Sequence, residues 1–269
     1  MEWGYSFSGF AVGILVGITG VGGGSLMTPL LVFLFGFKPS VAVGTDLLFA
    51  AITKTNGVWV HHSKHGSVDW QIVRWLAAGS LPAAIGTLYV IQQLMSVGKE
   101  TTGIITFTLG VALLLTALSL LVRSILLRKR EVIAPIDDKL STAANTGRFE
   151  DLQMPATVFI GIVLGILVTL SSVGAGALGT VALVFLFPRM STLKIVGTDL
   201  AHAIPLTAVA GAGHWFLGNV DFVLLGSLLI GSLPGIWIGS HISAKIPEVF
   251  LRLALGSILL LVGLKFVFQ

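Results

Sequence analysis

The chain carries the same five-residue block twice, once in each of two halves that hold several long apolar runs. Residues 43–47 read Val-Gly-Thr-Asp-Leu, and the same letters return at residues 196–200. Two more blocks match in the same order, Gly-Ser-Val-Asp-Trp with Gly-Asn-Val-Asp-Phe (66–70, 218–222) and Gly-Ser-Leu-Pro with itself (79–82, 231–234). Chance would rarely give these matches in one order, so we predict an internal duplication, an arrangement on which many membrane transporters are built.

The composition places this duplication in a membrane. The 269 residues are 55% hydrophobic and only 10% charged, with a mean hydropathy of +0.97, whereas roughly a quarter of the residues of soluble domains are charged. Six apolar runs reach the roughly 20 residues that cross a bilayer, at 41–60, 71–94, 102–127, 193–216, 222–242 and 249–267. The net charge of +4 is therefore expected to reflect basic cytoplasmic loops and not nucleic-acid binding.

Two other apolar stretches are interrupted by glycine near their middle. Residues 7–35 contain Gly20-Val21-Gly22-Gly23-Gly24, and residues 155–187 contain Gly174-Ala175-Gly176. Glycine disfavours helix by about 1 kcal/mol per residue. Each stretch is therefore predicted to form two short helices of about a dozen residues or slightly more.

The positions of lysine and arginine give the orientation. The stretch between the halves is rich in basic residues, which predicts that it is cytoplasmic; they are Arg123, Arg128, Lys129, Arg130, Lys139 and Arg148. Counting crossings from there, Arg189 and Lys194 fall inside only if each glycine-broken stretch returns to the side on which it started. Each stretch is then a hairpin and the two halves are inverted. A single long broken span, which would put Arg189 and Lys194 outside, is the alternative.

The predicted fold is an all-α polytopic membrane protein of two inverted repeats, each with a glycine-broken helical hairpin, re-entrant or spanning, and three transmembrane helices. Residues 1–127 form the first repeat, 128–153 a cytoplasmic linker and 154–269 the second repeat. The start of the chain lacks a basic region and a small-residue cleavage site, so we expect its first segment to remain as structure.

The glycine breaks are the first candidate site. Unwound backbone at membrane depth persists only where it is buried in protein or lines a cavity, and the following half-helix would aim its free N–H groups and positive dipole end into that space. This predicts an anion site; its residues are Gly22, Gly23, Gly24, Ser25, Ser172, Gly174, Ala175 and Gly176. The alternative is that these glycines only allow helices to pack closely.

The repeated Gly-Thr-Asp block supplies the next candidates. Thr45 and Thr198 are candidate substrate ligands, and Asp46 and Asp199 are candidate proton carriers beside each break. The alternative is local, since Thr could cap the helix that follows and Asp in its first turn would suit the dipole.

A lysine and a histidine at membrane depth complete the set. Lys54 lies about 12 Å further along the same predicted helix than Asp46, where an uncompensated cation is costly, so it is a candidate attractor for an anion, with Asn56 close by. An ion pair of Lys54 with Asp46 or Asp199 is the alternative. His202 lies on the helical face of Asp199 and would suit proton coupling, or it is a satisfied core residue.

No cofactor or metal is expected. Zero cysteines exclude thiolate ligands, and the remaining histidines have poor spacing for a metal site; they are His61, His62, His65 and His214. Pro82, Pro205 and Pro234 lie inside predicted spans as kinks or hinges.

The two glycine breaks, each followed by an apolar half-helix and then by Val-Gly-Thr-Asp-Leu, together with the doubled Gly-Ser-Leu-Pro, resemble the sulfite exporter TauE/SafE family of the 4-toluene sulfonate uptake permease superfamily. The resemblance covers nearly the whole chain except the linker. It implies transport of a small sulfur-containing anion, such as sulfite, sulfoacetate or a related organosulfonate, across the bacterial inner membrane, driven by the proton gradient. It fixes neither the substrate nor the direction.

The rival interpretations are a passive anion channel, a permease for a non-sulfur organic anion and an intramembrane enzyme. The first two can use the same half-helix dipoles. The enzyme is disfavoured because the chain contains neither Gly-x-Ser-x-Gly nor His-Glu-x-x-His. The expected partners are therefore a small anion and the lipid bilayer.

Overall fold

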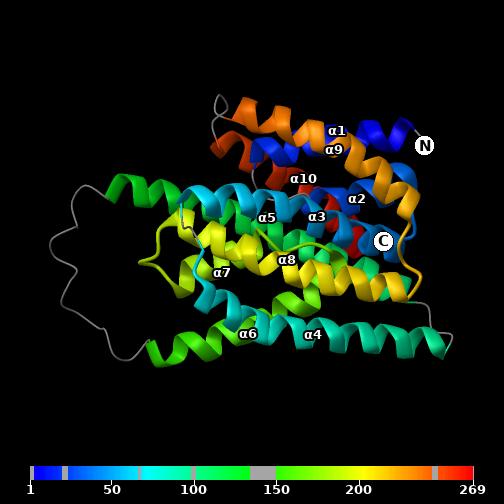
Figure 1. The fold of residues 1–269 in the computed structure, drawn as a ribbon, viewed down its shortest axis with the longest axis horizontal. Coiled ribbons are helices and arrows are strands. Elements are labelled where there is room, and N and C mark those ends of the chain that lie inside the picture. The colour runs from blue at the N-terminus through cyan, green and yellow to red at the C-terminus, as the bar shows by residue number, and fades with distance from the viewer. Residues whose placement is uncertain are drawn as a thin grey trace.

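The computed structural model describes residues 3–19, 24–65, 68–97, 101–133, 150–243 and 248–268. These residues form ten α-helices and no strand (Figure 1). The helices are α1 (Trp3–Thr19), α2 (Gly24–Phe35), α3 (Pro39–His65), α4 (Trp70–Ser96), α5 (Thr102–Ile133), α6 (Glu150–Ser171), α7 (Leu178–Leu186), α8 (Thr192–Phe216), α9 (Phe222–Ser243) and α10 (Glu248–Phe268). The prediction of an all-helical membrane fold is confirmed.

Five stretches of the described chain are long and apolar enough to cross a membrane, and they lie in α4, α5, α6, α8 and α9. Four of them coincide with predicted spans. The helices α3 and α10 cover the other two predicted spans, at 41–60 and 249–267, as uninterrupted helices. The helices α5 and α6 extend into the range predicted for the linker, because α5 continues to Ile133 and α6 begins at Glu150.

The second glycine-broken stretch differs in proportion from the prediction. Instead of two helices of similar length, α6 has 22 residues and α7 has nine. The glycines within α6 stay helical because they face another helix: a Cβ on Gly161 would lie 2.4 Å from the Leu76 carbonyl oxygen of α4. In the first half, α1 and α2 have 17 and 12 residues, as expected.

The break between α6 and α7 has the backbone geometry that its sequence predicts. Gly174 and Gly176 have φ 114° and 124°, values that glycine adopts without a steric penalty. Ser172 before them has φ 57°, in the small left-handed region that non-glycine residues seldom occupy. The chain turns here, and α7 packs against α6 (Figure 1). The corresponding residues 20–23 of the first half lie outside the described chain.

The first helix of each half packs against a helix of the other half. The first helix of the first half, α1, lies on α9 of the second half, and α6 of the second half lies on α4 of the first (Figure 1). Glycines allow both approaches: a Cβ on Gly231 would lie 1.9 Å from the Ser6 carbonyl oxygen, and one on Gly79 would lie 2.1 Å from the Val158 carbonyl oxygen. Small residues are the usual means of close helix contact in a membrane.

The ends of the bundle are also clear in Figure 1. Both chain termini lie toward one end, and the end of α5, the start of α6 and the junction of α7 with α8 lie toward the other. Buried side chains along α3 and α8 fill the centre; they include Val43, Leu47, Phe49, Leu206 and Ala210. The Gly-Thr-Asp blocks on these two helices thus lie in the core of the bundle.

Candidate functional site

Each Gly-Thr-Asp block reaches across to the other half. The Thr198 Oγ1 of α8 accepts a hydrogen bond from the backbone N–H of Asp69, at 2.9 Å, just before α4. In the same way, the Thr45 Oγ1 of α3 accepts from the backbone N–H of Asp221, at 3.0 Å, just before α9. In the duplication Thr45 matches Thr198 and Asp69 matches Asp221. The same contact is therefore made twice, with the roles of the two halves exchanged.

The idea that the blocks cap their own helices is wrong. The helices α3 and α8 begin at Pro39 and Thr192, well before Thr45 and Thr198, because only a short connection separates each from the preceding half-helix. Thr198 instead donates to the Lys194 carbonyl inside α8, at 2.7 Å.

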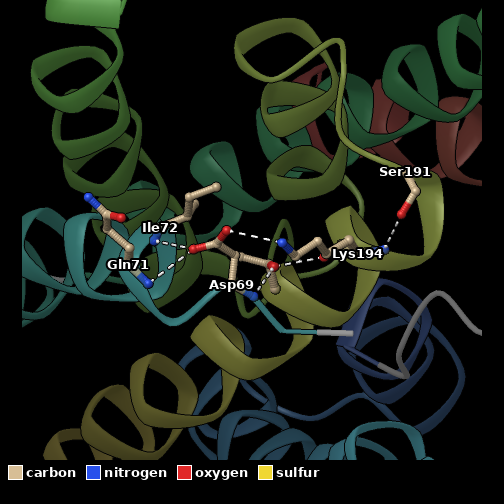
Figure 2. Close-up of polar contacts among 6 residues, drawn as sticks. Asp69, Gln71, Ile72, Ser191 and Lys194 are labelled. Carbon is tan, nitrogen blue, oxygen red and sulfur yellow. Dashed lines mark hydrogen bonds and ion pairs between the residues drawn. The ribbon is translucent and has the colours of Figure 1, made fainter. Parts of the chain in front are cut away.

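Figure 2 shows Asp69 and Ser191, the residues that do cap α4 and α8. The Asp69 carboxylate accepts from the backbone N–H groups of Gln71 and Ile72 at 3.1 and 3.4 Å and thereby caps α4. The Ser191 hydroxyl caps α8 by accepting from the Lys194 N–H. Lys194 Nζ also lies 3.5 Å from Asp69 Oδ2, in an ion pair whose side chains are 46% and 29% exposed. The α7–α8 loop therefore lies beside the start of α4.

The two carboxylates of the blocks are buried, and each is bonded to the half-helix of its own half. The Thr28 hydroxyl of α2 donates to Asp46 Oδ2 at 2.5 Å, and the Thr180 hydroxyl of α7 lies 2.7 Å from Asp199 Oδ2. All four side chains are at most 1% exposed. The sequence interpretation missed Thr28 and Thr180, although both lie in the matched half-helices and could have been found from that alignment.

Lys54 connects the first half to the break of the second. Its Nζ donates to the Ala175 carbonyl oxygen at 2.8 Å, and the side chain is only 5% exposed. Asp46 and Asp199 are the acidic residues close enough to interact with it when they are ionised. The direct contact of the ammonium is thus the unwound backbone, and the predicted candidates Lys54 and Ala175 are brought together.

His202 is held by a serine from the other half. Its Nε2 lies 2.8 Å from the Ser80 hydroxyl of α4, and its Nδ1 is buried without a hydrogen bond in the described structure. Ser80 belongs to the doubled Gly-Ser-Leu-Pro block, which was recognised only as a mark of duplication. The second histidine of this helix, His214, donates from Nε2 to the Thr169 carbonyl at 2.9 Å.

The remaining predicted residues divide into two groups. Ser172 is buried in the break, and its hydroxyl lies close to the Asp46 carboxylate; Gly174 and Gly176 shape the same turn. Gly24 begins α2. The residues Gly22 and Gly23 and the side chains of Ser25 and Asn56 lie outside the described chain, as do the side chains of His61, His62 and His65.

Comparisons with known proteins agree with this architecture. The family model described as "Sulfite exporter TauE/SafE" matches residues 5–266. The chain is similar to two Bacillus subtilis proteins, the probable membrane transporter proteins YjnA (39% identity) and YdhB (27%), each over 96% of this chain and 97% of the relative. It is also similar to the probable membrane transporter protein MJ0441 of Methanocaldococcus jannaschii, with 26% identity over 95% of this chain and 91% of the relative. No solved structure matches the chain.

Proposed function

Because this chain belongs to the sulfite exporter TauE/SafE family, whose relatives named above are probable membrane transporters, we propose that it moves a small sulfur-containing anion across the bacterial inner membrane. Sulfite, sulfoacetate and related organosulfonates are the substrates that fit the proposal. Transport is a secondary process coupled to protons. The two halves are inverted relative to each other and alternate the access of a central site between the two sides.

The observation that carries this proposal is the hydrogen bond from Lys54 to the Ala175 carbonyl. A buried ammonium has a large desolvation cost, and a carbonyl oxygen satisfies only part of its three-donor capacity. A sulfonate or sulfite oxygen offers a full negative charge at the same place. The anion would therefore take over the ammonium from the carbonyl, and the break would be free to change shape.

The second support is the start of α7. Its first turn has no side-chain cap, and the N–H groups of Leu178 and Gly179 donate instead to the Gly174 carbonyl of the break. The positive end of the helix dipole therefore lies beside the break. In this proposal the anion is bound between Lys54 and residues Ser172 to Gly176. The matching residues Gly22, Gly23, Gly24 and Ser25 and the Asn56 side chain contribute from the first half. Thr45 and Thr198 act on the site through the cross-half contacts and not as direct ligands.

Proton coupling is assigned to the buried groups around this site, namely Asp46, Asp199 and His202. They are nearly inaccessible to solvent in this conformation, which suits a closed state of an alternating-access cycle. Opening toward either side would expose them in turn. The cross-half contacts of Thr45 and Thr198 would break and reform in that exchange.

The test is an uptake screen in proteoliposomes with an imposed pH gradient. Sulfite, sulfoacetate, taurine and sulfate are offered to the wild-type protein, to Lys54→Ala and to the control Lys38→Ala, whose lysine is exposed in the α2–α3 connection. We expect uptake of at least one sulfur anion that follows the pH gradient, loss of uptake in Lys54→Ala and normal uptake in Lys38→Ala. Normal uptake by Lys54→Ala would contradict the proposed site.

The same screen separates the rival functions. Anion conductance without proton movement would indicate a passive channel. Uptake of a carboxylate without uptake of any sulfur anion would overturn only the substrate class.

A further inference from the structure

The hydroxyl of Thr180 faces two oxygen atoms that both normally accept hydrogen bonds. One is the Gly176 carbonyl oxygen in the glycine break, to which Thr180 Oγ1 makes a very short contact. The other is Asp199 Oδ2 at 2.7 Å. The three residues are buried within the bundle, so the arrangement must be satisfied by the protein's own hydrogen atoms.

A threonine hydroxyl carries one hydrogen atom, and an ionised carboxylate carries none. If Asp199 were ionised, one of the two contacts would bring two oxygen atoms together without a hydrogen between them, which is repulsive at hydrogen-bond distance. A protonated Asp199 removes the conflict, because it donates to Thr180 Oγ1 while the hydroxyl donates to Gly176. Both contacts are then ordinary hydrogen bonds.

Thr198, one turn before His202, shows the satisfied case in the same protein. Its hydroxyl donates to the Lys194 carbonyl and accepts from the Asp69 N–H. Each neighbour takes a different role, and no additional proton is needed. The Thr180 arrangement differs because both of its neighbours are oxygens.

We propose that Asp199 binds the coupling proton at Oδ2 in this closed conformation, and that Thr180 transmits its protonation to the glycine break through Gly176. The proton comes from the aqueous side to which the site last opened, forms an O–H bond with the carboxylate and leaves to the other side when that bond breaks. This inference rests on the proposed proton-coupled transport.

The Thr180 hydroxyl links the protonation of Asp199 to the conformation of the glycine break. When Asp199 loses its proton, Thr180 must turn its single hydrogen toward the carboxylate and release the Gly176 carbonyl. That carbonyl lies next to Ala175, whose own carbonyl holds Lys54. Loss of the proton therefore loosens the backbone segment that is proposed to bind the anion.

The charged and titratable groups around Asp199 are few in the described chain. Lys54 of α3 interacts with it and also with Asp46, and His202 follows it on α8 and interacts with Lys54. The described sequences of α7 and of α6 after Gln153 contain no titratable side chain. From α4, Asp69 and Arg74 lie near its start, where Asp69 is paired with Lys194 and Arg74 is exposed.

The first experiment needs no substrate. The infrared C=O stretching band of a protonated carboxylic acid is recorded at neutral pH for the full-length protein in lipid, in H₂O and in D₂O. We expect the band in the wild type and in Asp46→Asn, and its loss in Asp199→Asn. Persistence of the same band in Asp199→Asn overturns the inference, even if the protein transports a sulfur anion. Loss of the band there, together with a wild type that moves no anion, overturns only the proposed function.

The second experiment separates anion accumulation driven by a pH gradient from anion exchange at equal pH. Asparagine resembles the protonated side chain and can donate to Thr180, so Asp199→Asn should keep at least half of the wild-type anion exchange at equal pH but lose accumulation driven by a pH gradient. The control Lys38→Ala, whose lysine is exposed in the α2–α3 connection, should keep that accumulation. Accumulation that survives in Asp199→Asn, or wild-type uptake driven by a sodium gradient at equal pH on both sides, contradicts the proton assignment.

If Asp199→Asn does not fold, a pair of Thr180 variants tests whether this hydroxyl relays the protonation of Asp199. Thr180→Ser keeps the hydroxyl and should retain both the infrared band and pH-driven uptake. Thr180→Val removes the hydroxyl that accepts from Asp199, and should lose most of the band and most of the pH-driven uptake. Equal behaviour of the two variants would rule out a relay through this hydroxyl.

Discussion

Lys194 of α8 is ion-paired with Asp69, the residue that caps α4, with Nζ 3.5 Å from Oδ2. In the repeat register that aligns Asp199 with Asp46, the position of Lys194 is taken by Val41 in the first half. The cross-half contact of Thr198 is thus reinforced by an ion pair, whereas the corresponding contact of Thr45 has a valine at that place. The two cross-half contacts are therefore unequal, although the duplication pairs them.

Asp69→Asn should remove the ion pair while it keeps an oxygen that can cap α4. Because both partners are partly exposed, we expect a loss of only about 0–1 kcal/mol in stability, seen as a small drop in the thermal unfolding temperature in detergent. Lys194→Gln should give the same drop, and the double variant should lose no more than either single variant. Asp69→Ala should lose about 1 kcal/mol more because the cap is removed as well. Equal losses for Asn and Ala would contradict the capping role.

Thr198→Val and Thr45→Val should each leave a backbone N–H without its partner, that of Asp69 or of Asp221. An unsatisfied buried donor costs about 1–3 kcal/mol, and because both bonds are only partly buried the loss should lie toward the lower end. Both variants should therefore unfold at lower temperature, by similar amounts. Thr198→Ser and Thr45→Ser keep the hydroxyl and serve as controls, expected to stay near wild type. A valine variant as stable as its serine control would show that the cross-half bond contributes nothing.

The duplication, the membrane class and the helical content could all be predicted from sequence, because matched blocks and apolar length are local properties. The lengths of α6 and α7 could not. Gly161 and Gly165 look like helix-weakening residues in isolation, and only their contact with α4 explains why α6 continues through them to Ser171.

Only part of the candidate site could be predicted, because sequence shows unusual residues but not their contacts. Lys54, Asp46 and Asp199 stand out because a charge in an apolar run is unusual. The hydroxyl partners Thr28, Thr180 and Ser80 do not stand out, since threonine and serine are common in membrane helices. The contact of Lys54 with Ala175 joins the two halves, and no spacing within either half can indicate it. The alternative that Thr45 caps α3 is wrong because the helix begins earlier, at Pro39.

Gly231→Ala should separate α9 from α1. The new Cβ would lie 1.9 Å from the Ser6 carbonyl oxygen, so one of the two backbones must move. Overpacking of this kind costs about 1–3 kcal/mol, and a clear drop in thermal unfolding temperature is expected. Gly226→Ala in the same helix is the matched control, because a Cβ there has no neighbour within 4 Å and alanine favours helix. If the two variants unfold at the same temperature, the close approach of α1 and α9 is wrong.

Gly179→Ala tests the position of the Asp199 carboxylate directly. A Cβ at Gly179 would lie 2.0 Å from Asp199 Oδ1, and the matching residue of the first half is Met27, which already has a Cβ. The short Asp199 side chain can escape only by rotating away from α7, and this rotation breaks its contact with Thr180. We therefore expect pH-driven anion uptake to fall at least tenfold, while the thermal unfolding temperature falls no more than in Gly231→Ala. Gly103→Ala, at an exposed glycine of α5 with open space around it, should keep both properties. Normal pH-driven uptake by Gly179→Ala would mean that Asp199 does not need its place against the start of α7, and the coupling of its proton to the glycine break would have to be abandoned.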